Sequence, residues 1–432
     1  MKKFFDPQRQ EWEAILERPT KTVEDIEQVV EQIFREVKAG GDAAVKNYSR
    51  IFDGFNSDNF EVASEEIANA SAGLSEELKT AIGLAKENIR KFHAAQKTGR
   101  VTVETVSGVE CWQEKRSIQK VGLYIPGGSA PLFSTILMLA VPAQIAGCKE
   151  VILCTPPAKD GSVNPAILYA AQVCGIQKIY KVGGIQAIAA MTFGTESIEK
   201  VYKIFGPGNQ YVTVAKQLAT KYNVAIDMPA GPSELLVVAD DTADAAFVAS
   251  DLLSQAEHGA DSQVVLVSLS KELLEQVASE IEKQLEELPR KEIARAAIAH
   301  SRFIYMSSSE KALELIDKYA PEHFIICTSN PDFFVDGINN AGSVFIGNYT
   351  PESAGDYASG TNHTLPTNGY ARQYSGVNLD SFTKAITFQK ISSEGIQTIG
   401  PAIELMAEAE GLQAHKNAVA LRLKKLKTLN NE

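Results

Sequence analysis

Four of the six histidines lie in polar segments next to predicted turns, where an imidazole can reach a ligand. One of them, His258, follows Gln255 by three residues in the segment SQAEHGADSQ, on the last turn of a predicted helix that Gly259 ends. This spacing puts both side chains on one face of the helix, where they could bind one metal ion. A helix end that only contacts water would show the same pair, so a metal site needs further ligands.

Further candidate ligands occur in PESAGDYASGTNH, which holds Asp356 and His363, and in AEGLQAH, which holds Glu410 and His415. Carboxylate and imidazole groups bind hard or borderline metals. The run around Asp356 is rich in glycine and has no periodicity, so we expect a loop beside a ligand. A charged loop that only contacts water is the alternative.

A third candidate is the pair Glu322 and His323, which lies between a helical stretch and the apolar strand HFIIC. An imidazole can transfer protons near neutral pH, and a glutamate can activate water. Adjacent residues of a strand point to opposite faces, so both can serve one site only if the turn there is irregular. A polar pair on the surface is the other interpretation.

Short apolar strands that end in glycine or proline alternate with helices from residue 118 onward. The first series is VGLYIPGG, VILCTPP, IYKVGG, YKIFGPG and AIDMPAGP, and the second is ELLVVAD, QVVLVSLS, FIYMSS, HFIICTS and GSVFIGN. This alternation predicts an α/β protein with two parallel sheets that helices cover on both faces and with ligands at the carboxyl ends of the strands. The last part, from about residue 378, is expected to lose the strands and end in a helical tail.

The glycine-rich strand ends lack the GxGxxG spacing that is typical of dinucleotide-binding proteins. Gly183 and Gly184 follow one strand, and Gly206 and Gly208 follow another. Together with Tyr124 in LYIPGG, these glycines predict loops at one sheet edge where the backbone can approach a ligand closely. Tight turns that only the fold requires would look the same.

The composition excludes several classes of protein. A net charge of −12 over 432 residues argues against nucleic acid as a partner. The apolar stretch 136–146 is too short to cross a bilayer, and the polar N-terminus does not resemble a signal peptide, so we expect a cytoplasmic protein without membrane contact. The five cysteines have no paired spacing and most lie in apolar segments, which predicts reduced, buried thiols.

Eight motifs occur in the order of a known family and cover residues from about 118 to 420. The sequence resembles histidinol dehydrogenases in LYIPGGSAPLFST, KVGGIQAIAA, IFGPGNQYV, DMPAGPSE, SDLLSQAEHGADSQ, APEH, PESAGDYASGTNHTLPT and AEGLQAH. The resemblance implies a zinc-dependent enzyme that oxidises L-histidinol to L-histidine through L-histidinaldehyde. Two molecules of NAD are reduced in turn, at the last step of histidine biosynthesis.

The same resemblance assigns roles to individual residues. Glu322 and His323 become the acid/base pair, in which His323 takes the alcohol proton and Glu322 activates water. The remaining roles are NAD contacts for Tyr124, Gln186 and Asn209, zinc ligands for Gln255, His258, Asp356 and His415, and substrate contacts for Ser233, His363 and Glu410 besides those ligands and His323. Cys327 is the one thiol near the expected site.

The resemblance also implies two incomplete Rossmann-like domains and a homodimer with shared active sites, in which Glu410 and His415 come from the other subunit. The expected parts are an N-terminal helical segment (1–21), a first α/β domain with the catalytic and metal residues (22–123 and 235–377), a second α/β domain on the NAD side (124–234) and a helical tail that reaches the partner (378–432).

Three other functions stay open at this point. The first is a paralogue that oxidises another small amino or anionic alcohol with NAD. The second is a zinc hydrolase with Glu322 as the base, which would form no NADH. The third is a metal-binding regulatory module without turnover, and the intact pair Glu322 and His323 argues against it.

Overall fold

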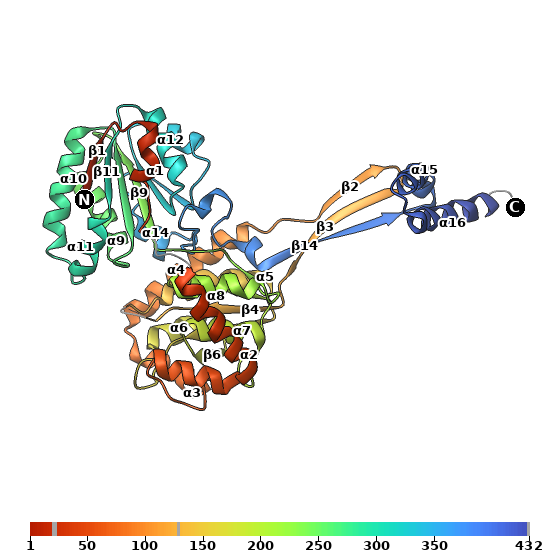
Figure 1. Ribbon diagram of the computed structural model, residues 1–432, viewed down its shortest axis with the longest axis horizontal. Helices are drawn as coiled ribbons and strands as arrows, with labels where there is room; N and C mark the ends of the chain where they lie inside the picture. Colours follow the sequence, from red (N-terminus) through yellow and green to blue (C-terminus); the bar gives the residue numbers. More distant parts are fainter. Residues whose placement is uncertain (20–23, 128–129, 430–432) are drawn as a thin grey trace. The chain divides into compact units, whose positions relative to one another are not determined.

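The alternating strands and helices build two parallel sheets (Figure 1). The computed structural model describes residues 1–19, 24–127 and 130–429. These residues divide into two units, of which the first comprises Met1–Gln96 and Ile118–Phe382 and the second comprises Lys97–Ser117 and Thr383–Glu432. Both parallel sheets belong to the first unit, which confirms the predicted fold class.

One sheet has five strands in the order β6-β5-β4-β7-β8. Its strands are β4 (Lys120–Tyr124), β5 (Glu150–Thr155), β6 (Lys178–Lys181), β7 (Lys203–Phe205) and β8 (Ala225–Ile226). The helices between them are α5 (Phe133–Ala146), α6 (Pro165–Val173), α7 (Gly184–Phe193) and α8 (Gln210–Thr220). Helix α6 begins as its sequence predicts, because the Asn164 side chain accepts from the amide of Ala166 and Pro165 occupies the first helical position.

The other sheet has six strands in the order β1-β11-β10-β9-β12-β13. Its strands are β1 (Lys2–Phe5), β9 (Glu234–Ala239), β10 (Gln263–Ser268), β11 (Arg302–Tyr305), β12 (His323–Cys327) and β13 (Ser343–Ile346). The helices that accompany it are α1 (Trp12–Ile15), α9 (Ala245–Ala256), α10 (Lys271–Leu285), α11 (Lys291–Ala299), α12 (Ser309–Tyr319), α13 (Pro331–Gly337) and α14 (Glu352–Tyr357). Alternate residues of β9 and β10 enter cores on opposite faces, so both faces of this sheet are covered.

The N-terminal part of the chain differs from the expected arrangement in two ways. Residues 2–5 form a strand that pairs in parallel with β11, so the segment 1–21 is not purely helical. Helices α2 (Glu24–Phe52) and α4 (Glu76–Ala95) pack on the five-stranded sheet, whereas we expected 22–123 beside the six-stranded one. Phe34 of α2 shares a core with Ile188 of α7, and Ile89 of α4 shares one with Leu139 of α5. Amphipathic helices indicate an apolar partner but not which sheet supplies it.

The second unit contains an antiparallel sheet that the sequence analysis missed. Its strands are β2 (Val101–Val106), β3 (Val109–Ser117) and β14 (Thr383–Ile391), in the order β14-β3-β2. The tail after residue 378 therefore keeps one long strand before α15 (Ser393–Ala409) and α16 (Gln413–Leu429). Gly108, at φ +77°, allows the turn between β2 and β3, and Trp112 stacks on Phe388 across the register.

The short helix α3 (Ser64–Asn69) precedes α4 along the chain. Ser75 caps the start of helix α4, with its side chain accepting from the amide of Leu78. Among the described residues, no helix combines the length and the apolar character that crossing a bilayer requires.

Candidate functional site

Glu322 and His323 meet in one site because the turn before β12 is irregular. Helix α12 ends at Ala320, which has a left-handed conformation with φ +54°, and Pro321 follows it. The chain then enters the sheet with His323 as the first residue of β12. Nδ1 of His323 lies 3.7 Å from Oε2 of Glu322, and both side chains are buried.

The backbone of Glu234, at the start of β9, positions both side chains. Its amide donates to Oε2 of Glu322 at 2.8 Å, and its carbonyl oxygen lies 3.1 Å from Nδ1 of His323. A carbonyl oxygen only accepts, so Nδ1 carries the proton of the neutral ring. Nε2 of His323 is buried and has no hydrogen-bond partner among the described residues, which leaves its lone pair available.

Arg18 in turn fixes Glu234 from the N-terminal segment. The Arg18 guanidinium forms a two-pronged contact with the Glu234 carboxylate, at 2.5 and 2.9 Å, and lies over the ring of Tyr319. The Glu234 side chain is almost fully buried, so this pairing compensates a charge that would otherwise be costly. The sequence analysis named neither Arg18 nor Glu234.

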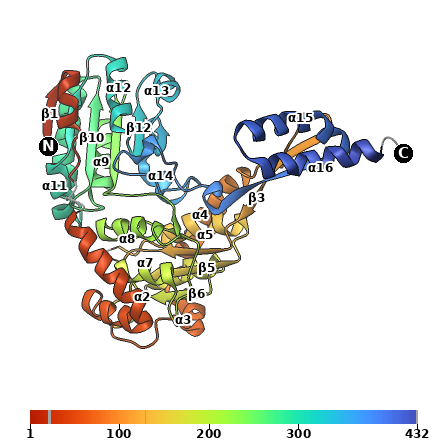
Figure 2. The same cartoon turned by 45° about the vertical axis from the view of Figure 1, so that its right-hand side comes forward.

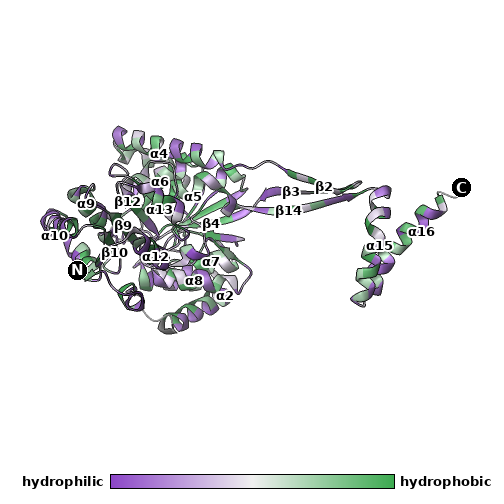
Figure 3. Cartoon of the chain, turned by 90° about the horizontal axis from the view of Figure 1, so that it is seen from above, coloured by the Kyte–Doolittle hydropathy of each residue, from purple (hydrophilic) through white to green (hydrophobic). Residues whose placement is uncertain are grey.

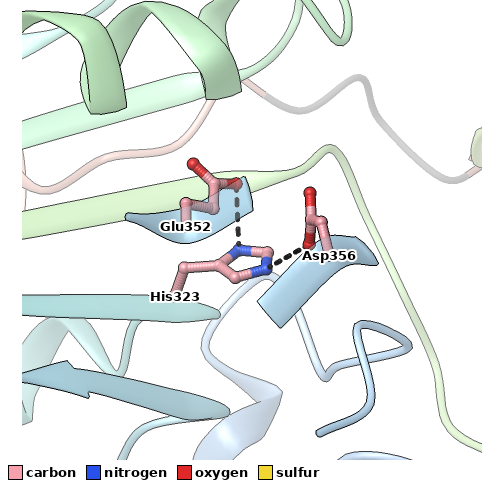
Figure 4. Close-up of side chains that lie close together, drawn as sticks. All are labelled: His323, Glu352 and Asp356. Carbon is pink, nitrogen blue, oxygen red and sulfur yellow. Dashed lines mark ion pairs between the residues drawn. The ribbon is translucent and has the colours of Figure 1, made fainter. Parts of the chain in front are cut away.

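Two carboxylates of α14, those of Glu352 and Asp356, lie beside the His323 ring (Figure 4). Oε1 of Glu352 lies 3.7 Å from Nδ1 of His323, and Oδ1 of Asp356 lies 3.6 Å from Nε2. One ligand atom from each of the three residues falls within 4.8 Å of the others, so this group could hold a metal ion. Asp356 lies on the short helix α14 and not in the loop that we expected from the sequence.

Glu352 is a further site residue that the sequence does not point out. It precedes Asp356 by four residues in PESAGD, a spacing that places two side chains on one face of a helix. We treated this segment as a loop, where the spacing carries no such meaning. Glu352 is 1% exposed and accepts from Ser254 at 3.1 Å through Oε2, while its Oε1 has no hydrogen-bond partner among the described residues.

Burial and mutual charge set the protonation of this cluster. Burial raises the pKa of Glu322 to about 8 and the pKa of Glu352 well above its usual value. Burial alone would lower the pKa of His323, but the three surrounding carboxylates outweigh it and raise this pKa. Burial acts against ionisation of Asp356, yet His323, His363 and His258 outweigh it and lower its pKa. These carboxylates thus stabilise the protonated form of His323, which is the form that the ring reaches when it accepts a proton.

His258 lies beside the same cluster, since Asp356, His323 and His363 act on its pKa, and Gln255 precedes it by three residues near the end of α9. Gln255 is fully buried, and neither its Oε1 nor its Nε2 has a hydrogen-bond partner among the described residues. Helix α9 ends at Ala256, so His258 lies just beyond it and reaches solvent. Partial desolvation lowers the pKa of His258, while Asp356 acts in the opposite direction. An amide with two unmet polar atoms beside a carboxylate and an imidazole suits a bound metal.

His363 and Ser233 border the cluster. Nδ1 of His363 lies 2.8 Å from the carbonyl oxygen of Asp356 and therefore carries the proton, while Nε2 accepts from the Thr135 hydroxyl at 3.0 Å. Burial lowers the pKa of this imidazole and keeps it neutral. Ser233 directly precedes β9 and is partly exposed.

Glu410 and His415 belong to the second unit. Glu410 ends α15, and His415 lies in the first turn of α16. Both are exposed within this chain, and the cluster of the first unit forms without them.

A cavity of about 1090 Å³ opens at the carboxyl ends of the five-stranded sheet, and Tyr124, Gln186 and Asn209 all line it. The Tyr124 hydroxyl accepts from the amide of Gly184 at 3.0 Å, and Asn209 caps α8. Gln186 is fully buried and its Oε1 lacks a partner among the described residues. The cavity has the size and the polar groups that an extended ligand requires.

The side chains of Cys327 and His93 lie outside the proposed chemistry. Cys327 is buried, and burial raises its pKa to about 12, so it is a neutral thiol rather than a nucleophile. His93 lies in the core, where it is fully buried and contacts Ile89 and Asn362.

Comparison with known proteins points to one family. The profile of the histidinol dehydrogenase family matches residues 16–423. A histidinol dehydrogenase of Bacteroides thetaiotaomicron is 57% identical over 427 residues, 99% of this chain and 100% of that protein. One of Shigella dysenteriae is 54% identical over 416 residues, 96% of this chain and 95% of that protein. The crystal structure of histidinol dehydrogenase from Elizabethkingia anophelis superposes with a TM-score of 0.96, at 57% identity and 99% coverage of both chains.

Proposed function

This chain belongs to the histidinol dehydrogenase family, and we propose that it oxidises L-histidinol to L-histidine through L-histidinaldehyde, reducing one NAD in each of two steps. It is an NAD-dependent enzyme of the last step of histidine biosynthesis. The observation that carries the detailed mechanism is the buried pair Glu322 and His323, in which the base atom Nε2 has no hydrogen-bond partner among the described residues.

The residues at the cluster fit a zinc ion. The ligands in this proposal are Gln255, His258 and Asp356 of the first unit and His415 of the second. The unmet amide atoms of Gln255 favour this set, because a buried polar group without a partner is otherwise costly. These residues would hold a zinc ion, which would bind the amino and imidazole nitrogens of the substrate more than it would polarise the reacting alcohol.

In the first oxidation His323 acts as the base. Nε2 accepts the hydroxyl proton of histidinol while the adjacent carbon loses its hydride, which NAD accepts when bound. The Glu234 carbonyl oxygen holds Nδ1–H, so the ring presents its lone pair in one direction. The surrounding carboxylates stabilise the imidazolium that forms.

In the second oxidation Glu322 activates water. Its carboxylate removes a proton as the water oxygen attacks the aldehyde carbon, and the resulting hydrate loses the second hydride to give the carboxylic acid. Burial raises the pKa of Glu322 to about 8, which makes it a better base than an exposed glutamate. Ser233, His363 and Glu410 complete the substrate contacts in this proposal, with Glu410 facing the ammonium or imidazole group.

The active sites are shared in a homodimer, so that Glu410 and His415 act on the partner's cluster. The second unit supports this proposal by its exposed apolar side chains, since Leu405 is 69% exposed, Met406 66% and Leu421 67%. Figure 3 shows apolar bands along α15 and α16. Exposed apolar surface of this kind is typical of a region that a partner covers.

The assignment of zinc ligands can be tested apart from turnover. We expect Asp356→Asn to lose zinc on dialysis, with the metal measured by mass spectrometry. His323→Asn should keep zinc but lose about 10²-fold or more in kcat, because a base and not a ligand is removed. Loss of zinc from His323→Asn would instead assign the metal to His323, Glu352 and Asp356.

The activity itself is tested with L-histidinol as the sole oxidisable substrate. The proposal predicts NADH formation that a chelator abolishes and added zinc restores. NADH formation with a different amino alcohol but not with histidinol would favour a paralogous dehydrogenase. Absence of NADH with every alcohol would favour a zinc hydrolase.

A further inference from the structure

The five-stranded sheet has the strand order of a dinucleotide-binding half. Its first strand along the chain, β4, lies in the centre, with β5 and β6 on one side and β7 and β8 on the other. In sheets of this order an acidic side chain follows the second strand and binds the hydroxyl groups of the adenosine ribose. Here the second strand β5 is followed by Pro156, Pro157, Ala158 and Lys159. The first acid of this segment, Asp160, accepts from the amide and hydroxyl of Ser162 and is not among the residues that line the cavity.

A carboxylate reaches this position from another element. Asp53 directly follows the long helix α2, which packs on the five-stranded sheet (Figure 2). Asp53 and Pro156 line the same cavity as Tyr124 and Gln186. A Cβ atom built on Gly183 would lie 2.6 Å from Cβ of Pro156 and 3.2 Å from Oδ1 of Asp53. The Asp53 carboxylate therefore lies at the ends of β5 and β6.

Neutral groups hold this carboxylate in place. Nε2 of Gln186 donates to Oδ2 at 3.1 Å, and the amide of Gly183 donates a further hydrogen bond. The next amide, of Gly184, donates to the Tyr124 hydroxyl. Asp53 and Tyr124 thus accept from the first amides of α7. The Asp53 carboxylate is partly exposed, and Asp53 lines the cavity.

We infer that Asp53 is a specificity-determining residue, which accepts hydrogen bonds from the ribose hydroxyls of the adenosine half of NAD and repels a 2′-phosphate. The inference rests on the proposed use of NAD by this chain. Lys159 lines the same cavity and offers a cation to a phosphate. Asp53 opposes that attraction, so the balance between these two side chains sets the preference for NAD over NADP.

The test is calorimetric binding of ADP-ribose and of 2′-phospho-ADP-ribose to the zinc-loaded, full-length protein. We expect Asp53→Asn to weaken ADP-ribose binding by about 10-fold and to strengthen binding of the phosphorylated analogue by about 10-fold. Asp53→Glu, which keeps the charge, should retain the preference of the parent. Adding Lys159→Gln to Asp53→Asn should remove the gain for the phosphorylated analogue.

The matched control is Asp58→Asn. Asp58 lies in the same segment, is exposed and pairs with Lys46, so the affinities for both ligands should stay as in the parent. An equal change for both ligands in Asp53→Asn would show a merely structural role and overturn the inference. If the parent binds ADP-ribose and forms NADH but Asp53→Asn leaves the ratio unchanged, the inference fails alone. A parent that binds neither ligand and forms no NADH contradicts the proposed function as well.

Discussion

At the residue scale, two histidines of the first unit show how burial decides what an imidazole does. His323 is buried among carboxylates, which raise its pKa, whereas His93 is buried without any, and burial lowers its pKa. His93 donates through Nδ1 to the Ile89 carbonyl oxygen, and its Nε2 lies 3.4 Å from the side-chain nitrogen Nδ2 of Asn362. One imidazole is equipped to take a proton, and the other is kept neutral in the core.

His93 should therefore make stability depend on pH. The pKa of His93 in the folded chain lies below 6.5, the usual value for histidine. The unfolded chain therefore binds more protons than the folded chain as the pH falls below 6.5. The free energy of unfolding should then decrease with falling pH, with a slope of up to about 1.4 kcal/mol per pH unit from this group. His93→Gln should remove that part of the slope and cost about 1–2 kcal/mol at pH 7.5. Urea unfolding at pH 5.5, 6.5 and 7.5 measures both effects.

His300→Gln is the matched control, because His300 is exposed at the end of α11. This variant should leave both the stability and its pH slope as in the parent. A parent-like slope in His93→Gln would show that other groups cause the pH dependence.

The residue types and spacings predict part of the site. Gln255 with His258, and Glu322 with His323, are visible because unusual side chains occur close together in the sequence. Glu234 is not visible in this way, since it acts through its backbone and its partners lie far away along the chain. Glu352 has the spacing of a helix face, but only the structure shows that its segment is helical.

At the element scale, the active pair depends on how the N-terminal segment meets β9. Arg18 binds the Glu234 carboxylate, and the Glu234 backbone holds both Glu322 and His323. The Arg18 guanidinium also donates to the Tyr319 carbonyl oxygen at 2.7 Å, near the end of α12. One side chain thus connects three segments that come together only in the folded protein.

Arg18→Met should weaken both stability and catalysis. It leaves the buried Glu234 carboxylate without its cation, which costs about 3–5 kcal/mol in the free energy of unfolding. Displacement of the Glu234 backbone should lower kcat by about 10-fold or more with a smaller effect on KM. Adding Glu234→Gln removes the unpaired charge and should recover part of the stability. Chemical denaturation and steady-state kinetics of the parent and the two variants test this account, and full activity in Arg18→Met would contradict it.

The elements themselves were predictable to different degrees. The βα alternation identifies both parallel sheets because buried parallel strands are short, apolar and separated by helices. The antiparallel sheet of the second unit is harder to detect, since every residue of β2 is exposed within this chain. Val101 and Val103 alternate with Thr102 and Glu104, but the alternation breaks after four residues, so the strand signal in the sequence is short.

At the scale of the whole molecule, the proposed dimer predicts complementation between two inactive variants. His415→Asn lacks a ligand from the second unit, and His323→Asn lacks the base of the first unit. If His415 acts on the partner's cluster, each mixed dimer contains one intact site, and equal mixing should restore about a quarter of the parent activity. Absence of recovery in mixed dimers would place both residues of each site in one chain.

The exposed apolar residues of α15 are expected to hold this dimer together. Leu405→Asp should shift the protein from dimer to monomer in sedimentation velocity and abolish activity, because a buried charge opposes association. Leu84→Asp, at a 60% exposed position of α4, is the control and should stay dimeric. A dimeric, active Leu405→Asp variant would show that the contact lies elsewhere.

The central claim is that one site performs both oxidations, with His323 as base in the first and Glu322 activating water in the second. The measurement that tests it most directly is the number of NADH formed per histidinol consumed by the zinc-loaded protein, compared with Glu322→Gln. The account predicts two NADH in the parent and a value that falls toward one in the variant, with aldehyde released. A parent value of one, or an unchanged value of two in Glu322→Gln, would contradict the role assigned to Glu322.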